Sequence, residues 1–269
     1  MTENENWTRV ECDAGGGQAD QDLLRRLIDG DVAVVRLRGL LPAAEFAANR
    51  ERLRRIFSDA TTTRYVNGAL TTIGPYLAKY LSRPDDYFTA ARAAENRLDE
   101  VSFDLSAQVR QALTKEFGLH SLRPAEEPDG RRYGDAVVRV HADGVSNPLH
   151  NDNIMRDARD TGLALAGLRH QLSCVVCVEE CDEGGELRIY QRSWRPEDEA
   201  FKIDGGLGYD AGVVAGAPVH TFRPRAEDVY LINPTHYHEI ERVHGADRTT
   251  LGFFVGFPGE SLTDAVVWG

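Results

Sequence analysis

A run of short strands in the second half of the chain constrains its fold more than any other feature. From residue 136 onward, β-branched and aromatic residues come in short runs separated by Gly, Asn and Pro, a pattern typical of a barrel or sandwich. The runs predicted to be strands cover residues 136–141, 171–178, 186–191, 218–222, 228–232, 238–243 and 249–257. The second half is therefore expected to be mainly β.

The first half has the spacing of apolar residues that indicates helices. Helices are predicted over residues 21–28, 43–57, 73–81, 87–97 and 105–117, with one strand at 32–37. A surface connection at 124–130 joins the halves, and both can pack on one sheet. We therefore predict one domain over residues 1–269, in which 1–135 is mainly helical and buttresses a β core formed by 136–269.

Charge and composition limit the partners and the compartment. The chain has 43 acidic and 31 basic residues and a formal net charge of −12, which would repel a phosphate backbone, so nucleic acid is not expected as a partner. No signal peptide and no apolar run of about eighteen residues is found, so no membrane association is expected. The four cysteines are too few for a disulfide scaffold, which favours the cytoplasm. A monomer or a homodimer is expected.

Two of these cysteines, Cys174 and Cys177, have the spacing of a redox or zinc pair. They lie in a segment that reads as a buried strand, where residues three apart face opposite sides. We interpret both thiols as inert core residues.

The residues that carry chemistry are two histidines and a carboxylate. His150 and Asp152 form an H-x-D triplet, and on extended backbone both side chains lie on one side and can reach a single ion. His238 follows on a later strand. Two imidazoles and one carboxylate suit an Fe(II) ion, and they leave positions open for an organic acid and O₂.

Other residues compete for these roles. A second triplet, His141-Ala-Asp143, lies on the preceding strand, and His236 shares a strand face with His238. His238 stands ten residues before Arg248, which favours it over His236, whereas His244 is too close to Arg248 and fits a solvated turn. Arg248 and Thr250 share one strand face, so a guanidinium and a hydroxyl can together hold a carboxylate beside the metal.

With these residues the sequence resembles the Fe(II)/2-oxoglutarate-dependent dioxygenases. That family has H-x-D/E, a distal His, then Arg or Lys about ten residues on, often with Ser or Thr two further. The turn Gly184-Gly-Glu-Leu187 is similar to the prolyl-hydroxylase type of the family. The resemblance covers residues 136–257, and the whole layout is similar to the bacterial branch that hydroxylates or halogenates free amino acids.

The resemblance implies a double-stranded β-helix, a jelly-roll or cupin-like core buttressed by the N-terminal helices. It implies that Fe(II) is held by His150, Asp152 and His238, and that 2-oxoglutarate chelates the iron. Arg248 would anchor the far carboxylate of 2-oxoglutarate with help from Thr250, and O₂ would be the oxidant. Halogenases of this family have Gly or Ala in place of the carboxylate ligand, so Asp152 favours hydroxylation, desaturation or oxidative cyclisation.

The substrate pocket is less well marked in the sequence. Arg139 and His141 share a face of one strand, and an inward Arg would suit a substrate carboxylate. A solvated Arg and a satisfied core histidine are the alternatives. Asn153 follows the triplet closely enough to touch substrate, and Trp268 either closes over the pocket or packs on the barrel. The Gly-rich stretch at 204–216 reads as a loop, either a lid or a plain connection.

We therefore expect an enzyme that oxidises an unactivated C–H bond of a small polar substrate, a free amino acid or a derivative in a biosynthetic pathway. The alternatives are a protein or peptide hydroxylase of the same family, a non-catalytic metal-binding β-helix protein, and a zinc hydrolase that uses the same three ligands.

Overall fold

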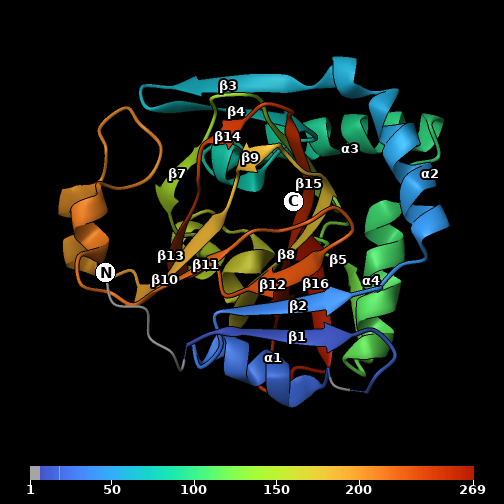
Figure 1. The fold of residues 1–269 in the computed structure, drawn as a ribbon, viewed down its shortest axis with the longest axis horizontal. Coiled ribbons are helices and arrows are strands. Elements are labelled where there is room, and N and C mark those ends of the chain that lie inside the picture. The colour runs from blue at the N-terminus through green and yellow to red at the C-terminus, as the bar shows by residue number, and fades with distance from the viewer. Residues whose placement is uncertain (1–6, 18) are drawn as a thin grey trace.

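One ten-stranded sheet takes strands from both halves of the chain in the computed structural model, which describes residues 7–17 and 19–269 (Figure 1). Its strands run in the order β1 (Arg9–Asp13), β2 (Val34–Arg38), β12 (Val229–Ile232), β8 (His170–Glu179), β15 (Arg248–Phe257), β6 (Val137–His141), β4 (Gly68–Ile73) and β3 (Thr61–Tyr65). Two further strands extend it, because β16 (Asp264–Trp268) pairs with β15, and β5 (Ser121–Pro124) pairs with β16.

A smaller sheet forms the other half of the β core. Its order is β11 (Val219–Phe222), β10 (Leu187–Ser193), β13 (His236–Ile240) and β7 (Asn147–His150), and β9 (Glu183–Gly184) pairs separately with β14 (Val243–His244). Along the chain, β6, β8, β12 and β15 belong to the large sheet and β7, β10, β11 and β13 to the small one. This is the predicted double-stranded β-helix, and that prediction is confirmed.

The helices are α1 (Gln21–Ile28), α2 (Ala43–Arg54), α3 (Pro84–Glu100), α4 (Leu105–Glu116) and the short α5 (Ile154–Asp157). Helices α1, α2 and α4 contribute buried residues to the main core cluster on the outer face of the large sheet, whereas buried residues of α3 and α5 pack in a second cluster that contains Trp268 of β16. Short 3-10 turns span Phe57–Asp59, Leu77–Tyr80, Ala164–Gly167, Pro196–Phe201 and Ala211–Val214. Figure 1 shows α1 along one side of the sheet and α2 and α4 along another. Among the residues described, no helix combines the length and apolar character needed to cross a bilayer.

Strand β15 shows how the two faces of the large sheet differ. Leu251, Phe253 and Val255 belong to the main core cluster, which also contains buried leucines of α1 and α4. Thr250 and Phe254 point the other way and line a cavity between the sheets. Because side chains alternate along a strand, one strand serves both the core and the cavity.

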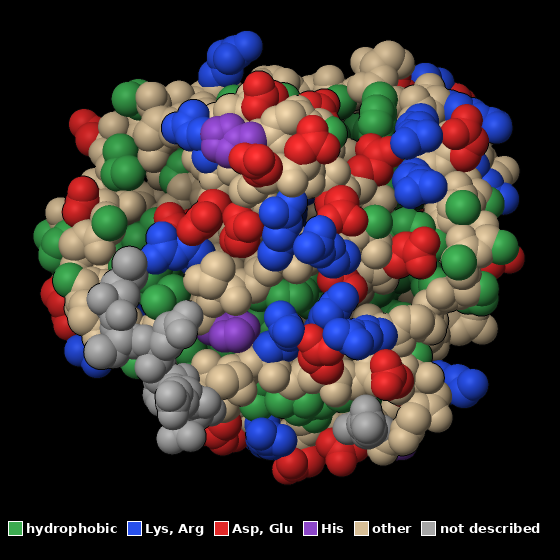
Figure 2. Space-filling model, in the orientation of Figure 1, with side chains coloured by type: hydrophobic (Ala, Val, Ile, Leu, Met, Phe, Trp, Pro, Cys, Tyr) green, Lys and Arg blue, Asp and Glu red, His purple; other side chains and the backbone are tan. Residues whose placement is uncertain are grey.

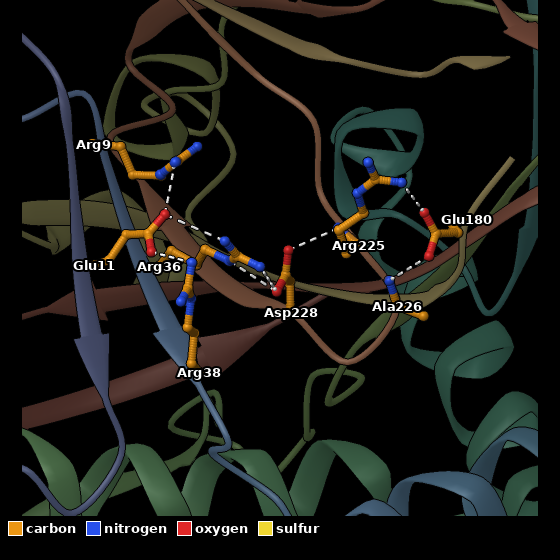
Figure 3. Close-up of polar contacts among 8 residues, drawn as sticks. All are labelled: Arg9, Glu11, Arg36, Arg38, Glu180, Arg225, Ala226 and Asp228. Carbon is orange, nitrogen blue, oxygen red and sulfur yellow. Dashed lines mark hydrogen bonds and ion pairs between the residues drawn. The ribbon is translucent and has the colours of Figure 1, made fainter. Parts of the chain in front are cut away.

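The N-terminal strands are held to the β core by an ion-pair network at one end of the large sheet (Figure 3). The Arg36 guanidinium on β2 donates to Asp228 Oδ1 at 2.8 and 2.6 Å, and it also contacts Glu11 on β1 at 3.3 Å. Asp228 is itself buried and also accepts from the Arg225 backbone N–H at 2.7 Å. These contacts join β1, β2 and the start of β12. Elsewhere on this face, charges of both signs are interspersed (Figure 2).

One predicted helix is wrong. Residues 73–81 are divided between the end of β4 and the 3-10 turn Leu77–Tyr80. Gly74 has φ +89°, and Pro75 follows it, so a continuous helix cannot pass this point. The spacing of Ile73, Leu77 and Leu81 imitates a helical face, but Ile73 packs in the main core cluster, whereas Leu77 and Leu81 pack in a second cluster.

The strand predicted around Cys174 and Cys177 is confirmed as β8. Both thiols are fully buried, and Cys174 lies in the core cluster on the helix side. Burial raises the pKa of Cys177 to about 12, which keeps this thiol protonated at neutral pH.

Candidate metal and cosubstrate site

Three side chains that can hold a metal ion converge at one end of the cavity between the sheets. His150 ends β7, Asp152 follows two residues later, and His238 lies in the middle of β13. Their ligand atoms lie within 4.8 Å of one another. The Asp152 carboxylate is 3.7 Å from His150 Nε2 and 3.8 Å from His238 Nε2.

Hydrogen bonds to the backbone fix which ring nitrogen of each histidine faces the cluster. The Nδ1–H of His150 donates to the carbonyl of Pro148 at 2.8 Å, and that of His238 donates to the carbonyl of His236 at 2.9 Å. A carbonyl can only accept, so Nδ1 carries the proton and the Nε2 lone pair is free to bind a metal. Burial also lowers the pKa of His238 well below its ordinary value, which keeps this ring neutral.

The backbone holds the third donor in place. The Asp152 N–H donates to the carbonyl of Pro234 at 2.8 Å, which ties the residue to the loop before β13. Two neutral imidazoles and one carboxylate on one side of a small space fit an ion that keeps other positions open. This donor set therefore suits Fe(II).

Arg248 and Thr250 lie on the opposite wall of the same cavity, which encloses about 130 Å³. Both are buried, and Arg248 Nη2 donates to the hydroxyl of Tyr230 on β12 at 3.4 Å. The structure thus brings a guanidinium and a hydroxyl to face the histidines and Asp152 across a space suited to a small dianion.

The Gly184-Gly185 turn has a structural role beside this arginine. Gly185 has φ +71°, and a Cβ at this position would lie 3.0 Å from Arg248 Cδ and 2.8 Å from Cys181 Sγ. A side chain here would therefore be strained and would also displace the arginine. This explains physically why the turn before β10 needs glycine.

Arg139 and His141 on β6 both line the cavity. In the pairing of β6 with β15, His141 is opposite Arg248 and Arg139 is opposite Thr250. His141 is 1% exposed, and neither of its ring nitrogens has a hydrogen-bond partner among the described residues. Burial, with Arg248 and Arg139 nearby, lowers the pKa of His141 to about 3. The satisfied core histidine considered from the sequence is therefore not found.

The structure places Asn153 and Trp268 outside the cavity wall. The Asn153 side chain caps α5 by accepting from the Arg156 N–H at 3.1 Å. Trp268 on β16 is 1% exposed and packs against Phe254, with ring centroids 5.4 Å apart. Trp268 is paired with Phe254 across β15 and β16, so it packs beside a cavity residue on the same face of the sheet, as in the barrel-packing alternative.

The competing histidines lie elsewhere. His236 packs edge-on against Trp7, with ring centroids 5.9 Å apart, and it does not line this cavity. His244 lies on β14 with its side chain 55% exposed. Neither belongs to the cluster that His150, Asp152 and His238 form.

Sequence reasoning missed the residues that close the cavity from the first half of the chain. Leu70 on β4, and Tyr76 and Ala78 after it, line the wall, as does Leu207 of the Gly-rich loop. Asn67, at the β3–β4 turn, holds Leu207 by donating to its carbonyl and accepting from its N–H, both at 2.8 Å. The Asn67-Gly68 pair was a turn signal that could have revealed this hairpin.

The fold and this cluster define the class: the Fe(II)- and 2-oxoglutarate-dependent dioxygenases. Within it, the chain belongs to the family of the carrier-protein-independent halogenase WelO5, whose model matches residues 4–268. A curated relative, Leucinostatins biosynthesis cluster protein S of Purpureocillium lilacinum, is 27% identical over 176 residues, which cover 62% of this chain and 70% of that protein.

Two solved structures share the fold. An N-substituted L-amino acid dioxygenase from Burkholderia ambifaria AMMD, in complex with alpha-KG, superposes with a TM-score of 0.58 at 15% identity, covering 92% of this chain and 90% of that one. The alpha-ketoglutarate-dependent epimerase SnoN from nogalamycin biosynthesis has a TM-score of 0.52 at 15% identity, covering 89% and 85%.

Proposed function

We propose that this enzyme uses Fe(II), 2-oxoglutarate and O₂ to oxidise an unactivated C–H bond of a small polar substrate, a free amino acid or a derivative, in a biosynthetic pathway. The observation that carries this proposal is the convergence of His150, Asp152 and His238 on one side of a cavity whose opposite wall presents Arg248. The likeness to a biosynthesis cluster protein supports the pathway context.

Each residue has a role that its surroundings support. His150 and His238 would bind iron through Nε2, because their Nδ1–H groups are already engaged by carbonyls. Asp152 would supply the anionic ligand. Arg248 would bind the far carboxylate of 2-oxoglutarate, with Thr250 adding a hydroxyl hydrogen bond.

When bound, iron and 2-oxoglutarate would supply the oxidising chemistry: 2-oxoglutarate loses CO₂ and becomes succinate with one oxygen atom of O₂, and the other oxygen atom enters the hydroxylated product, or leaves as water when the substrate loses two hydrogen atoms. The chain binds and orients these molecules and excludes water. Leu187, Ile240 and Phe254 give the cavity an apolar wall, which suits positioning of a C–H bond away from solvent.

The presence of Asp152 favours oxygenation over halogenation. The family takes its description from a halogenase, but in this chain the Asp152 carboxylate lies within 3.8 Å of the Nε2 atoms of both His150 and His238. A halide that took the third ligand position would have to displace this carboxylate. We therefore favour hydroxylation, desaturation or oxidative cyclisation.

The net charge and the cysteines support a proposal about the compartment and the partners of the enzyme. A net charge of −12 argues against a nucleic-acid substrate, and four free, buried cysteines suit the reducing cytoplasm. We propose a cytoplasmic enzyme that acts on a small molecule, without a membrane partner, as a monomer or a homodimer.

The test is a turnover assay on anaerobically purified protein. Fe(II), 2-oxoglutarate and a panel of amino acids and their N-acyl derivatives are added, and O₂ is then admitted. We expect succinate to form only when iron is present and to rise with a substrate that gains one oxygen atom or loses two hydrogen atoms. Succinate formation that is absent, or indifferent to iron, would overturn the proposal, and a chlorinated product in the presence of chloride would overturn the choice of oxygenation.

A further inference from the structure

Arg139 is a cation in the cavity wall, and the roles proposed above for binding iron and 2-oxoglutarate do not involve it. It is half-buried on β6, with its side chain on the cavity face. On the neighbouring β15, a Cβ at Gly252 would lie 2.7 Å from Arg139 Nη1. The missing side chain at Gly252 therefore makes the space in which the guanidinium lies.

The Arg139 guanidinium has no hydrogen-bond or ion-pair partner among the residues that the structure describes. Within the described part of the chain, no hydrogen bond or ion pair joins it to another side chain or carbonyl, unlike Arg248, which contacts Tyr230. Burial lowers the pKa of Arg139, partly offset by the Asp152 carboxylate. Arginine nevertheless stays protonated in proteins, so Arg139 offers five unused N–H donors to whatever enters the cavity.

The charges of the cavity do not balance without a further anion. Among the described lining residues, Arg139 and Arg248 are cations and Asp152 is the one carboxylate. His150 and His238 count as neutral, because each Nδ1–H donates to a backbone carbonyl and each Nε2 lone pair is left for the metal. His141 also counts as neutral, because it is buried and neither ring nitrogen has a hydrogen-bond partner among the described residues. Fe(II) adds two positive charges and 2-oxoglutarate adds two negative ones. One positive charge therefore remains, and a buried charge without a counterion is unfavourable.

From this imbalance we infer that Arg139 binds a carboxylate of the substrate, and that the substrate is a carboxylic acid whose nitrogen, if it has one, is not a cation. This inference rests on the proposed function. A carboxylate brings the missing negative charge, and a guanidinium fork binds it with two parallel hydrogen bonds. A free α-ammonium group on the substrate would bring back the excess positive charge. Asp152, the one carboxylate among the described lining residues, could not neutralise this group because it would bind the metal.

The same guanidinium could serve the metal-proximal carboxylate of 2-oxoglutarate, so the experiment measures the two ligands separately. Protein is kept anaerobic with Fe(II), which prevents turnover. 2-Oxoglutarate binding is titrated first. Equilibrium dialysis of the loaded protein then measures retention of three matched sets: N-acetyl-L-amino acids, the same free L-amino acids, and the N-acetyl-L-amino acid amides.

The variants are Arg139→Met, which removes the charge, and Gly252→Ala, which leaves Arg139 present but fills the space of its guanidinium. Arg26→Met on α1 is the control, since Arg26 is exposed and lies outside the cavity. Thermal unfolding of each variant checks that it is folded. If Arg139→Met does not fold, Gly252→Ala still tests the contact.

We expect the wild-type protein to retain N-acetyl acids in preference to free amino acids and amides. Arg139→Met and Gly252→Ala should weaken this binding about tenfold to a hundredfold, with 2-oxoglutarate affinity unchanged and Arg26→Met like the wild type. The inference would be overturned if both variants bind the acids as tightly as the wild type does, or if the wild-type protein retains acids and amides equally. It would also be overturned if the wild type prefers free amino acids or retains none of the three sets. A loss confined to 2-oxoglutarate affinity would assign Arg139 to the cosubstrate instead. If wild-type protein binds neither iron nor 2-oxoglutarate, the proposed function itself fails.

Discussion

His150 and His238 are direct partners in the ladder between β7 and β13, and each ring donates its Nδ1–H to a carbonyl two residues earlier in its own strand. The ring centroids are 4.2 Å apart, with the planes inclined at 48°. Sheet pairing and the two backbone hydrogen bonds together orient both Nε2 atoms before any ligand binds. The donor pair is therefore preorganised by the small sheet.

Asp152→Ala should remove the anionic donor while leaving this histidine pair in place. We expect iron affinity to fall by more than about a hundredfold, because even partners behind metal ligands contribute tenfold to a hundredfold. Iron content after dialysis and succinate formation are the measurements. Asp160→Ala, at an exposed position, is the matched control. Full iron binding by Asp152→Ala would show that the carboxylate is not a ligand.

Arg248→Met should weaken 2-oxoglutarate binding about tenfold to a hundredfold, since charge-assisted hydrogen bonds to a dianion are lost. Arg248→Lys should recover only part of the loss, because an ammonium group cannot form a bidentate contact. Anaerobic titration of 2-oxoglutarate into the iron-loaded protein checks both variants. The role assigned to Arg248 is wrong if the affinity stays within about twofold of the wild type.

Gly185→Ala and Gly216→Ala separate backbone strain from contact with Arg248. Both glycines have positive φ, +71° and +76°, but a Cβ at Gly216 would meet nothing within 4 Å. Both variants should lose about 1–2 kcal/mol of unfolding free energy through the left-handed backbone. Only Gly185→Ala should also weaken 2-oxoglutarate binding. Equal affinities in the two variants would contradict a role for Gly185 in placing Arg248.

His141 should make the protein less stable in mild acid. Its pKa is about 3 when folded and about 6.5 when exposed, so the unfolded chain binds more protons between these values. Stability is therefore fully present above about pH 6.5 and falls below it by about 1.4 kcal/mol per pH unit for this one group.

Urea unfolding of metal-free protein between about pH 7 and about pH 5 measures this slope. His141→Gln should flatten it, and His120→Gln should not, because the His120 side chain is 74% exposed. An unchanged slope in His141→Gln would show that the ring gains its proton freely in the folded protein.

Asn67→Ala should release the Gly-rich loop from the β3–β4 turn. Two partly buried hydrogen bonds to Leu207 are lost, each contributing about 1 kcal/mol. We expect faster hydrogen exchange at the Leu207 amide and a raised KM for the substrate, with kcat less affected. Val66→Ala, at a side chain that is 81% exposed, is the control. Unaltered exchange in Asn67→Ala would mean that other contacts hold the loop.

The site was predictable where its residues are close in sequence or fixed by strand periodicity. His150, Asp152, His238, Arg248 and Thr250 all carry such local signals. The neighbours that complete it do not: Tyr230 and Gly252 reach Arg248 and Arg139 only through the pairing of β12, β8, β15 and β6. The register of this strand pairing cannot be predicted from a single sequence.

Much of the fold could also be predicted from local sequence patterns. The prediction failed where a strand depends on pairing with distant segments. Most strands of the β-helix are apolar and well punctuated, so their sequence pattern is strong, but the short β7, which begins with Asn147 and Pro148, was not predicted. Strands β1, β3, β4 and β5 are short and lie at or near the edges of the large sheet, and Thr-rich β3 buries little. Their stability comes from pairing with distant segments, which local propensity does not record.

The cavity has two kinds of wall, and this division bears on how such an enzyme diversifies. The iron and cosubstrate side is built from paired strands of the β-helix, where a change disturbs the sheet. The other side is contributed by Leu70, Tyr76, Ala78 and Leu207, from a hairpin, a 3-10 turn and a loop. Such segments tolerate insertion and exchange. Selection can therefore reshape what the enzyme accepts while inheriting its oxidative machinery intact.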